Sequence, residues 1–472
     1  MSSHVRRVGA LAALLLLAQI LLADPAAAHG ISGRASLPVP AWLFAWAAAI
    51  VLVVSFVALS ALWSTPRLQE LRLRRLGRVP RFVTPLCGLV GVALFAVVIW
   101  AGYAGVDSYT ANFDPTFIYV IFWVGVPLAS VVFGDLFSAF SPWRALARAS
   151  RWLGMRTGVE WKPPLTYPAW LGRWPVVAGL FAFGWLELIY HDHANPGLLA
   201  SLSLAYLVLM LAAMALFGIE TWSDRGDAFG GYFKMLSRLS LLEVRDRVLY
   251  RRRPLSALPS MPVEAGTVAM VLVSIGIITF DGASNGVVWN HLGPHIQSFF
   301  TSLGAGDTAA DELSDSVGLL IAIGVVSSFF WLGVLGMRSV SRLFGTRELA
   351  HSFVHTLVPI AFAYVLAHYF SLFVWQGQAI GYLASNPLGH HDNFFGTAHW
   401  HINYNFLGST AIWYVQVAAL VIGHVSGLIL AHDRALSIYR STIEAVRSQY
   451  WMLAVMVTFT CLGLWLLSAV NT

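Results

Sequence analysis

Cysteine and charge are both scarce in this sequence. The 472 residues include only two cysteines, Cys87 and Cys461, and both lie within apolar runs. We therefore predict neither a disulfide framework nor a cysteine-based metal site. Charged residues make up 11% of the chain and hydrophobic residues 58%, and the mean hydropathy is +0.70. This composition excludes an ordinary soluble protein and predicts a multi-span membrane protein.

Several common enzyme motifs are absent as well. The sequence contains no P-loop and no His-Glu-x-x-His, so neither a nucleotide site nor that zinc-protease motif is indicated. It also shows no internal repeat, no low-complexity tract and no soluble domain. If the protein is an enzyme, we expect its chemistry in loops and at helix ends, with metal-activated water as the nucleophile.

Long apolar runs dominate the chain. Lipid offers no hydrogen-bond partners to the backbone, so a chain that crosses it must satisfy its own N–H and C=O groups. We therefore predict an all-α polytopic membrane helix bundle. Arg6 and Arg7 precede an apolar run and the small residues 26–28, a pattern typical of a cleavable signal peptide over 1–28. Cleavage at another position, or an uncleaved anchor, is the alternative. We predict ten transmembrane helices in the remaining domain, 29–472, at residues 42–63, 83–106, 116–140, 174–190, 198–220, 264–281, 317–337, 350–375, 409–432 and 449–469.

The basic residues predict how these helices are oriented. If the mature N-terminus is outside, 26 of the 29 lysine and arginine residues fall in inside loops, and the others are Arg6, Arg7 and Arg34. Because basic residues collect on the cytoplasmic side, we predict an inner-membrane protein with its N-terminus and histidine-rich loops on the extracytoplasmic side. The inside loops are 67–81, 144–173, 225–253, 338–347 and 434–447.

The net charge of +6 does not indicate a nucleic-acid partner. The basic segment 225–253 is partly amphipathic, and we expect it to lie along the membrane surface, attracted by anionic lipid. Positive-inside topology already accounts for its charge.

One outside loop, 376–408, is unusually rich in histidine. His390, His391, His399 and His401 fall within seventeen residues, together with Asp392. Neutral imidazole is the commonest metal ligand, and His-His or His-x-His spacing lets a short segment offer two ligands to one ion. We predict that this loop helps to build a metal site just outside the membrane.

Two further outside loops repeat the pattern. In 191–197, His191-Asp192-His193 offers two rings and a carboxylate; a polar hairpin cap is the alternative. In 282–316, His291 and His295 would share one face of a helix, although Pro294 argues against a regular helix. Three alternatives remain for the carboxylates of that loop. They bind the metal, they attract cations to it, or they form a solvated acidic surface.

Cleavage after Ala28 would add His29, whose amino and ring nitrogens together suit copper. Zinc is the other expected metal, because a histidine-bound zinc ion lowers the pKa of its water to about 7. Asp192 or Asp392 would then accept the proton from that water. The predicted site thus combines a divalent metal with two candidate catalytic carboxylates.

A second group of histidines lies within the predicted spans: His351, His355, His368 and His424. Ionisable groups at such depths face protein or water and often mark proton or ion paths. The alternative is that the first two are interfacial and that His368 is hydrogen-bonded to a neighbouring helix. Glu187, near the end of another span, and Asp192 are candidates to accept a hydrogen bond from a metal-bound histidine of the 191–197 loop or to bridge to the metal.

Three stretches carry a resemblance to a known family. Residues 28–34 read AHGISGR, residues 37–46 read LPVPAWLFAW and residues 133–143 read FGDLFSAFSPW. With the histidine-rich loop, they resemble bacterial multi-pass membrane proteins known as fenitrothion hydrolases, which break an aryl ester bond of an organophosphorus insecticide. The resemblance implies a membrane hydrolase acting on an apolar small molecule, and it raises the expectation of a second membrane subunit. It carries over no catalytic residues.

These observations leave three functional hypotheses. The first is a membrane-bound hydrolase that cleaves the P–O-aryl bond of organophosphorothioate triesters with metal-activated water. The second is a copper-handling protein, a periplasmic copper binder, transporter or oxidase built around His29 and the outside loops. The third is a structural membrane subunit with a polar outer face. Zinc with product release favours the first hypothesis, and a His29-dependent copper signal favours the second.

Overall fold

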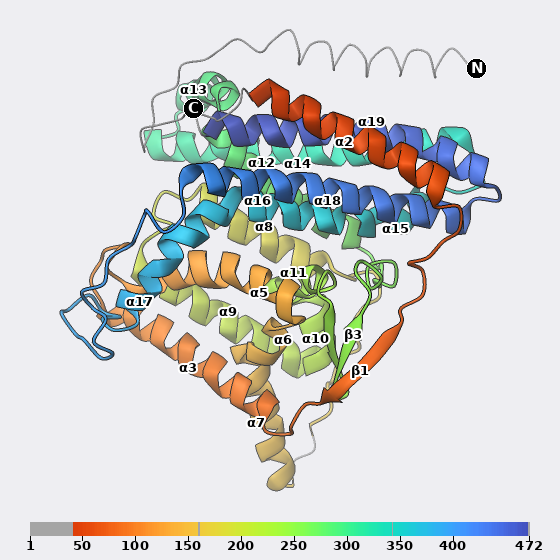
Figure 1. Cartoon of the computed structure of the whole chain (residues 1–472). Helices are drawn as coiled ribbons and strands as arrows, with labels where there is room; N and C mark the ends of the chain where they lie inside the picture. The colour runs from red at the N-terminus through yellow and green to blue at the C-terminus, as the bar shows by residue number, and fades with distance from the viewer. Residues whose placement is uncertain (1–40, 159–160, 342, 471–472) are drawn as a thin grey trace.

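The computed structural model describes residues 41–158, 161–341 and 343–470. The predicted signal peptide and His29 lie outside the described residues. The chain forms a helical bundle with one small sheet, and each of the ten predicted spans is helical (Figure 1). The corresponding elements are α2 (Ala41–Leu62), α3 (Val83–Ala104), α4 (Phe113–Thr116) with η1 (Phe117–Gly125) and α5 (Val126–Phe133), α8 (Trp174–Leu188), α9 (Pro196–Phe217), α12 (Thr267–Ser284), α14 (Asp307–Val340), α15 (Thr346–Phe353) with η2 (Val354–Leu357) and α16 (Val358–Gln376), α18 (Ser409–Ile438) and α19 (Thr442–Val470).

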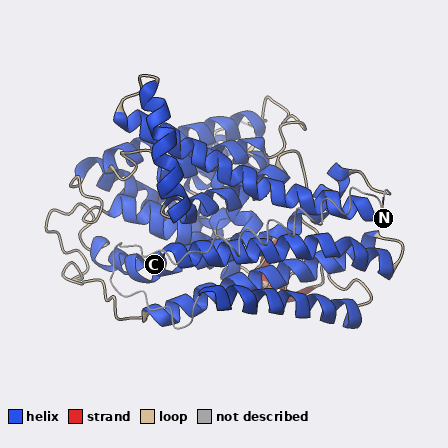
Figure 2. Ribbon diagram, turned by 90° about the horizontal axis from the view of Figure 1, so that it is seen from above, coloured by secondary structure: helices blue, strands red, loops and turns tan. Residues whose placement is uncertain are grey.

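Shorter helices connect these elements. They are α6 (Phe137–Phe140), α7 (Pro142–Arg156), α10 (Ile219–Arg225), α11 (Ala228–Ser237), α13 (Val287–Ser302), η3 (Gly377–Ala379) and α17 (Ile380–Leu383). Figure 2 shows from above that helices dominate the described chain and that loops connect them at both ends.

Seven helices in the described ranges are long and apolar enough to cross a membrane. They are Val83–Ala104, Phe113–Phe133, Pro196–Phe217, Thr267–Ser284, Asp307–Val340, Thr346–Leu383 and Ser409–Ile438. The apolar parts of α2 and α8 are shorter, at Trp46–Leu62 and Trp174–Leu188. The chain is therefore a multi-pass membrane protein by the length and composition of its helices.

The long helices form two groups that share α12 and α16. In one group α2, α14, α18 and α19 pack side by side with these two helices, across the top of Figure 1. In the other group α3, α7 and α9 pack together, and α8 packs on both α11 and α12. The boundary between the groups is thus formed by α8, α12, α16 and η1, since η1 contacts α16.

The arginine-rich loops depart from the all-helical prediction. Strands β1 (Leu73–Arg78), β2 (Leu242–Arg245) and β3 (Val248–Arg252) form an antiparallel sheet in the order β1-β3-β2. Asp246 and Arg247 both have positive φ, 50° and 60°, which suits the tight turn of a hairpin. In addition, α11 is mostly buried inside the bundle. The surface position expected for all of 225–253 is therefore wrong for α11.

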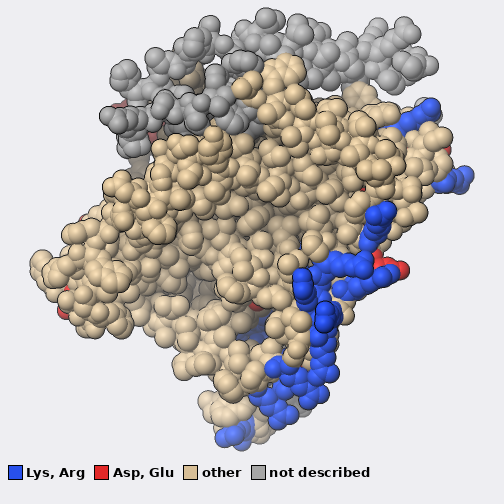
Figure 3. All heavy atoms as spheres, in the orientation of Figure 1, with Lys and Arg blue, Asp and Glu red and all other residues tan. Residues whose placement is uncertain are grey.

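The two ends of the bundle differ in chemistry. At one end, the backbone nitrogen of Val106 donates to Leu388 O at 2.8 Å and that of Phe113 donates to Pro387 O at 3.1 Å. These bonds join the loop 105–112 to the loop 384–408, so we call this the histidine end. Lysine and arginine gather at the other end, over β1, β3 and α7 (Figure 3), which we call the arginine end.

Candidate functional site

The shape of the histidine-rich loop 384–408 depends on two polar side chains rather than on its histidines. Ser385 is buried; its hydroxyl donates to Asn393 Oδ1 at 2.9 Å and accepts from the Phe395 backbone nitrogen at 2.9 Å. Asn393 Oδ1 also accepts from the Ala398 backbone nitrogen at 3.0 Å. Asp392 is half-buried, whereas the four imidazoles are exposed. These are His390, His391, His399 and His401.

The two rings of the His191-Asp192-His193 segment have different partners. His191 Nδ1 lies 2.6 Å from Glu312 Oε1 on α14, and its backbone nitrogen donates to the same oxygen at 3.1 Å. His193 is half-buried, and its Nδ1 lies 2.9 Å from Tyr190 O. Asp192 is exposed. Each ring is therefore held by its own acceptor, and the pair does not converge.

His291 and His295 do come together, on α13. Pro294 lies inside this helix, so the helical alternative is the observed one despite that proline. The two ring centroids are 5.4 Å apart, as expected for residues one turn apart on a helix. Both side chains are exposed. Of the predicted ligand pairs, this one is best placed to share an ion.

The predicted ligands that lie within the described residues do not gather around one point. In residues 41–158, 161–341 and 343–470, no three His, Cys, Asp or Glu side chains come together in a way that could hold a metal ion. The histidine groups share one end of the bundle but remain separate there. The metal site predicted from His29 and these loops therefore stays a prediction. The roles assigned to Asp192 and Asp392 as proton acceptors stay predictions.

The most concentrated chemistry lies inside the bundle, on α12 and α16. Asp281 Oδ2 lies 2.9 Å from His368 Nε2 and accepts a hydrogen bond from the Tyr369 hydroxyl at 2.7 Å. The side chains of His368 and Asp281 remain 22% and 18% exposed. A water-sized molecule can therefore touch both side chains, although the surrounding helices are apolar.

Glu187 on α8 and Tyr119 on η1 belong to the same region. Glu187 lies near Asp281, Tyr119 and Tyr369, within range of an electrostatic interaction with each. Its Oε2 is buried and has no hydrogen-bond partner among the described residues. The Tyr119 hydroxyl donates to His193 O at 2.7 Å, which connects this region to the histidine end. We call Tyr119, Glu187, Asp281, His368 and Tyr369 the buried polar group.

Close helix packing brings the members of the buried polar group together. A Cβ atom on Gly184 would lie 2.8 Å from Ile277 Cδ1, so only glycine lets α8 approach α12 this closely, one turn from Glu187 and Asp281. On the other side, η1 is a π-helix, an element that often occurs at functional sites. Trp123 of η1 packs on Phe183 of α8 with ring centroids 4.7 Å apart.

Asp114 is a further buried carboxylate towards the histidine end. The residue is fully buried at the start of α4, where its backbone nitrogen donates to the capping side chain of Asn112 at 3.0 Å. Neither carboxylate oxygen has a hydrogen-bond partner in the described part of the chain. A Cβ atom on Gly102 of α3 would lie 2.7 Å from Asp114 Oδ2. Glycine at that position therefore makes the room that this side chain occupies.

The Asp281–His368 pair has the geometry of a general base with its orienting group. A carboxylate bound to one imidazole nitrogen fixes the tautomer and leaves the other nitrogen to accept a proton. The Tyr369 hydroxyl adds a second donor to the carboxylate, which stabilises its ionised form. The arrangement can therefore activate water or a hydroxyl group inside a largely apolar environment.

Sequence reasoning identified only part of the buried polar group. His368 and Glu187 were singled out, and the alternative that His368 contacts a neighbouring helix is confirmed by its contact with Asp281. Asp281, Tyr119 and Tyr369 were missed. The available signal was a carboxylate, Asp281, at the end of an otherwise apolar span, since such residues are costly in a membrane unless they have a function or a partner.

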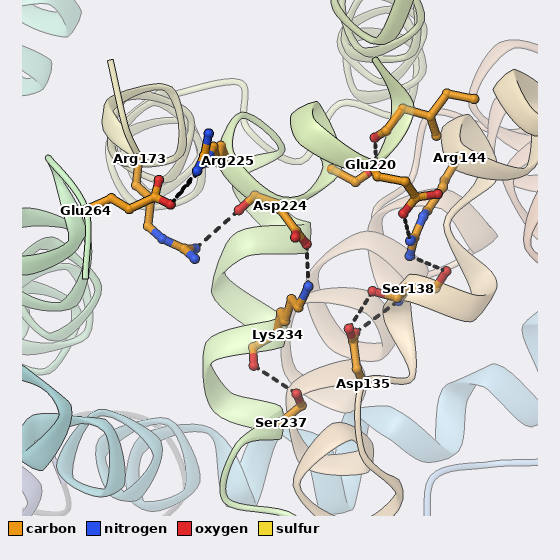
Figure 4. A network of polar contacts seen from close by, with 12 residues as sticks. Asp135, Ser138, Arg144, Arg173, Glu220, Asp224, Arg225, Lys234, Ser237 and Glu264 are labelled. Atoms are coloured by element: carbon orange, nitrogen blue, oxygen red, sulfur yellow. Dashed lines mark hydrogen bonds and ion pairs between the residues drawn. The ribbon is translucent and has the colours of Figure 1, made fainter. Parts of the chain in front are cut away.

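A separate polar network ties the connecting segments together at the arginine end (Figure 4). Glu220 pairs with both Arg144 and Arg148, and Arg144 also donates to Ser138 O at 3.1 Å. Burial raises the pKa of Glu220, but the two guanidinium groups outweigh it and hold the pKa below its ordinary value. Nearby, Arg225 and Glu264 pair at 2.7 Å. Each glutamate and arginine named here pairs with an opposite charge, so we interpret this network as structural.

Comparisons with known proteins add no relative to this geometry. No family model, no characterised protein and no solved structure matches the chain.

Proposed function

We propose that the protein is an integral membrane hydrolase that cleaves the P–O-aryl bond of organophosphorothioate triesters such as fenitrothion. One observation carries this proposal: the Asp281–His368–Tyr369 contact lies within a bundle of apolar helices and stays partly accessible. A neutral, apolar triester concentrates in the bilayer and can enter between helices, where a charged substrate could not. The resemblance to fenitrothion hydrolases supports the same substrate class.

The proposed topology accompanies this function. The signal peptide 1–28 is removed, ten helices cross the inner membrane, and the histidine end faces the extracytoplasmic side. On the face shown in Figure 3, lysine and arginine gather away from the histidine end, which supports this orientation. The buried polar group then lies in the outer half of the membrane, because Tyr119 connects it to His193 at the histidine end.

In the proposed reaction His368 acts as the general base. Its Nε2 is held by Asp281, so Nδ1 takes a proton from water while the water oxygen forms a bond to phosphorus. The P–O-aryl bond breaks, and the nitrophenolate leaves with the bonding electron pair. The imidazolium stays paired with the Asp281 carboxylate until its proton passes to the nitrophenolate or to solvent. The products are the dialkyl thiophosphate and the nitrophenol.

The metal-dependent route predicted from the histidine loops is a separate proposal. His291 and His295 are the pair best placed to share a zinc or copper ion. This pair is also the observation that favours the copper-handling alternative. Metal content should be measured in wild type and in a His291→Ala/His295→Ala variant. Bound copper without hydrolysis of fenitrothion would favour copper handling.

The hydrolase proposal is tested by nitrophenolate release from fenitrothion by the purified full-length protein in lipid nanodiscs. Loss of a general base costs about 10²–10⁴ in rate, so His368→Gln should lose at least about 100-fold. The matched control is His424→Gln, because His424 is a fully buried histidine on the neighbouring helix α18. Equal losses in both variants, or no hydrolysis by wild type, would overturn the proposal.

A further inference from the structure

A second candidate site lies at the arginine end of the bundle. A hollow of about 640 Å³ opens there between α15 and α18. This volume falls within the range of small-molecule sites, about 300–1,000 Å³. The hollow shares no residue with the buried polar group. The helix α15 lies at the start of the continuous helical segment α15–η2–α16, whereas His368 lies in the far part of α16, next to the histidine-rich loop.

Three basic side chains line the hollow from two helices. Arg347 and His351 lie one turn apart on α15, so they present their side chains on one face. Arg434 comes from α18. Guanidinium groups bind phosphate oxygens through paired hydrogen bonds, which a single ammonium cannot reproduce. A wall of this composition suits a phosphate-bearing anion.

Arg434 is held in position by the protein itself. Its Nε donates to Ser352 O at 3.2 Å, and one terminal nitrogen donates to Gln69 Oε1 at 2.8 Å. These contacts use two of the five N–H donors of the guanidinium group, and the others remain for a ligand. A side chain ordered in advance loses little conformational entropy when it binds.

Glu348, the one acidic side chain among the described residues that line the hollow, does not cancel this charge. Glu348 Oε2 accepts a hydrogen bond from the backbone nitrogen of Gly345 at 3.4 Å, so it caps the first turn of α15. Two arginines against one capping glutamate leave the hollow positive.

The remaining wall is apolar. Met261 is buried and Val263 is half-buried, and both line the hollow. Inorganic phosphate has no apolar group to bury against this surface. A phospholipid carries glycerol and acyl carbons beside its phosphate, and these can be buried there. Lysine and arginine also gather at the arginine end (Figure 3), and a basic surface of this kind attracts anionic lipid.

We propose that this hollow binds a phosphate-bearing anion through Arg347, His351 and Arg434, with the headgroup of an anionic phospholipid as its occupant. This inference is independent of the proposed hydrolase activity. The hollow would hold one lipid headgroup at a defined site, whereas a basic surface attracts a membrane without binding any one lipid.

The test compares two variants of the full-length protein. Arg347→Gln/His351→Gln removes two of the three basic groups and leaves the structural bonds of Arg434 intact. Arg440→Gln is the matched control, because Arg440 is an exposed arginine in the 434–447 segment that does not line the hollow. Retention of phosphatidylglycerol is measured by native mass spectrometry after release from mixed phosphatidylglycerol and phosphatidylcholine nanodiscs. Inorganic phosphate is titrated into the same proteins in pure phosphatidylcholine nanodiscs.

The double variant should retain phosphatidylglycerol about tenfold less than wild type, with phosphatidylcholine unchanged and Arg440→Gln close to wild type. Binding of inorganic phosphate that depends on Arg347 and His351, without selective retention of phosphatidylglycerol, would support the phosphate site and overturn the lipid as its source. Equal effects of both variants, or no effect of the double variant on either probe, would overturn the site.

Discussion

Asp281→Asn tests how the buried polar group works. Asp281 Oδ2 is contacted by His368 Nε2 at 2.9 Å and by the Tyr369 hydroxyl at 2.7 Å. A hydrogen bond to an ionised group is about twice as strong as a neutral one, so loss of the charge weakens each contact by about 1 kcal/mol. The two contacts together amount to about 2 kcal/mol, which is more than tenfold in rate if it is all felt in the transition state. The asparagine amide can also present a donor to His368 and select the wrong tautomer.

We therefore expect Asp281→Asn to lower kcat/KM for fenitrothion by at least about 100-fold. If the carboxylate acts through the imidazole, the double variant Asp281→Asn/His368→Gln should fall no further than His368→Gln alone, because residues that act as a unit are not additive. The assay is nitrophenolate release in nanodiscs. Asp315→Asn is the control, since Asp315 is a carboxylate outside the group that accepts a hydrogen bond from Trp289 Nε1 at 2.9 Å. Additive losses in the double variant would refute this reasoning.

Three further predictions concern single side chains. Tyr369→Phe removes one hydrogen bond and leaves the His368 contact, so kcat/KM should fall by only about three- to tenfold; a loss as large as that of Asp281→Asn would contradict this. Gly102→Ala places a Cβ atom 2.5 Å from Ala200 Cβ and should destabilise the protein by about 1–3 kcal/mol in thermal unfolding. Gly324→Ala, with no atom within 4 Å, should not, and equal melting of the two variants would contradict the packing argument. The ion pairs of Glu220, whose pKa is lowered, stabilise the protein above the ordinary carboxyl pKa of about 4.3 and are lost as the pH falls through the folded-state pKa. The melting curves of Glu220→Gln and wild type should therefore differ at neutral pH and converge in acid, and a constant difference would contradict the pairing.

The apolar runs were sufficient to predict the helices, because a backbone in lipid has few other ways to satisfy its hydrogen bonds. Helix ends were predicted less well. The predicted loop 282–316 contains α13 and the first turns of α14. There the Trp289–Asp315 bond and the bond from the Ser314 hydroxyl to Gly293 O at 3.0 Å stabilise helices that hydropathy alone does not mark. The sheet was missed because β1 and β3 lie far apart in the sequence and pair only in the folded chain.

The candidate site was predicted in its parts and not in its arrangement. The histidine loops do share one end of the bundle, as the distribution of basic residues predicted. Their rings stay apart because other partners hold the segments, such as Glu312 for His191 and the Ser385–Asn393 bond for the loop 384–408. His368 was noticed, but its partner Asp281 lies on another helix, and no spacing rule connects two helices that are distant in the sequence.

The most direct test of this account compares the buried polar group with the exposed histidine loop. Fenitrothion hydrolysis and bound metal would be measured side by side for purified wild type, His368→Gln and His399→Ala/His401→Ala. The account predicts that hydrolysis is lost in His368→Gln and kept in the loop variant. Loss of hydrolysis together with stoichiometric metal in the loop variant, with activity intact in His368→Gln, would contradict it.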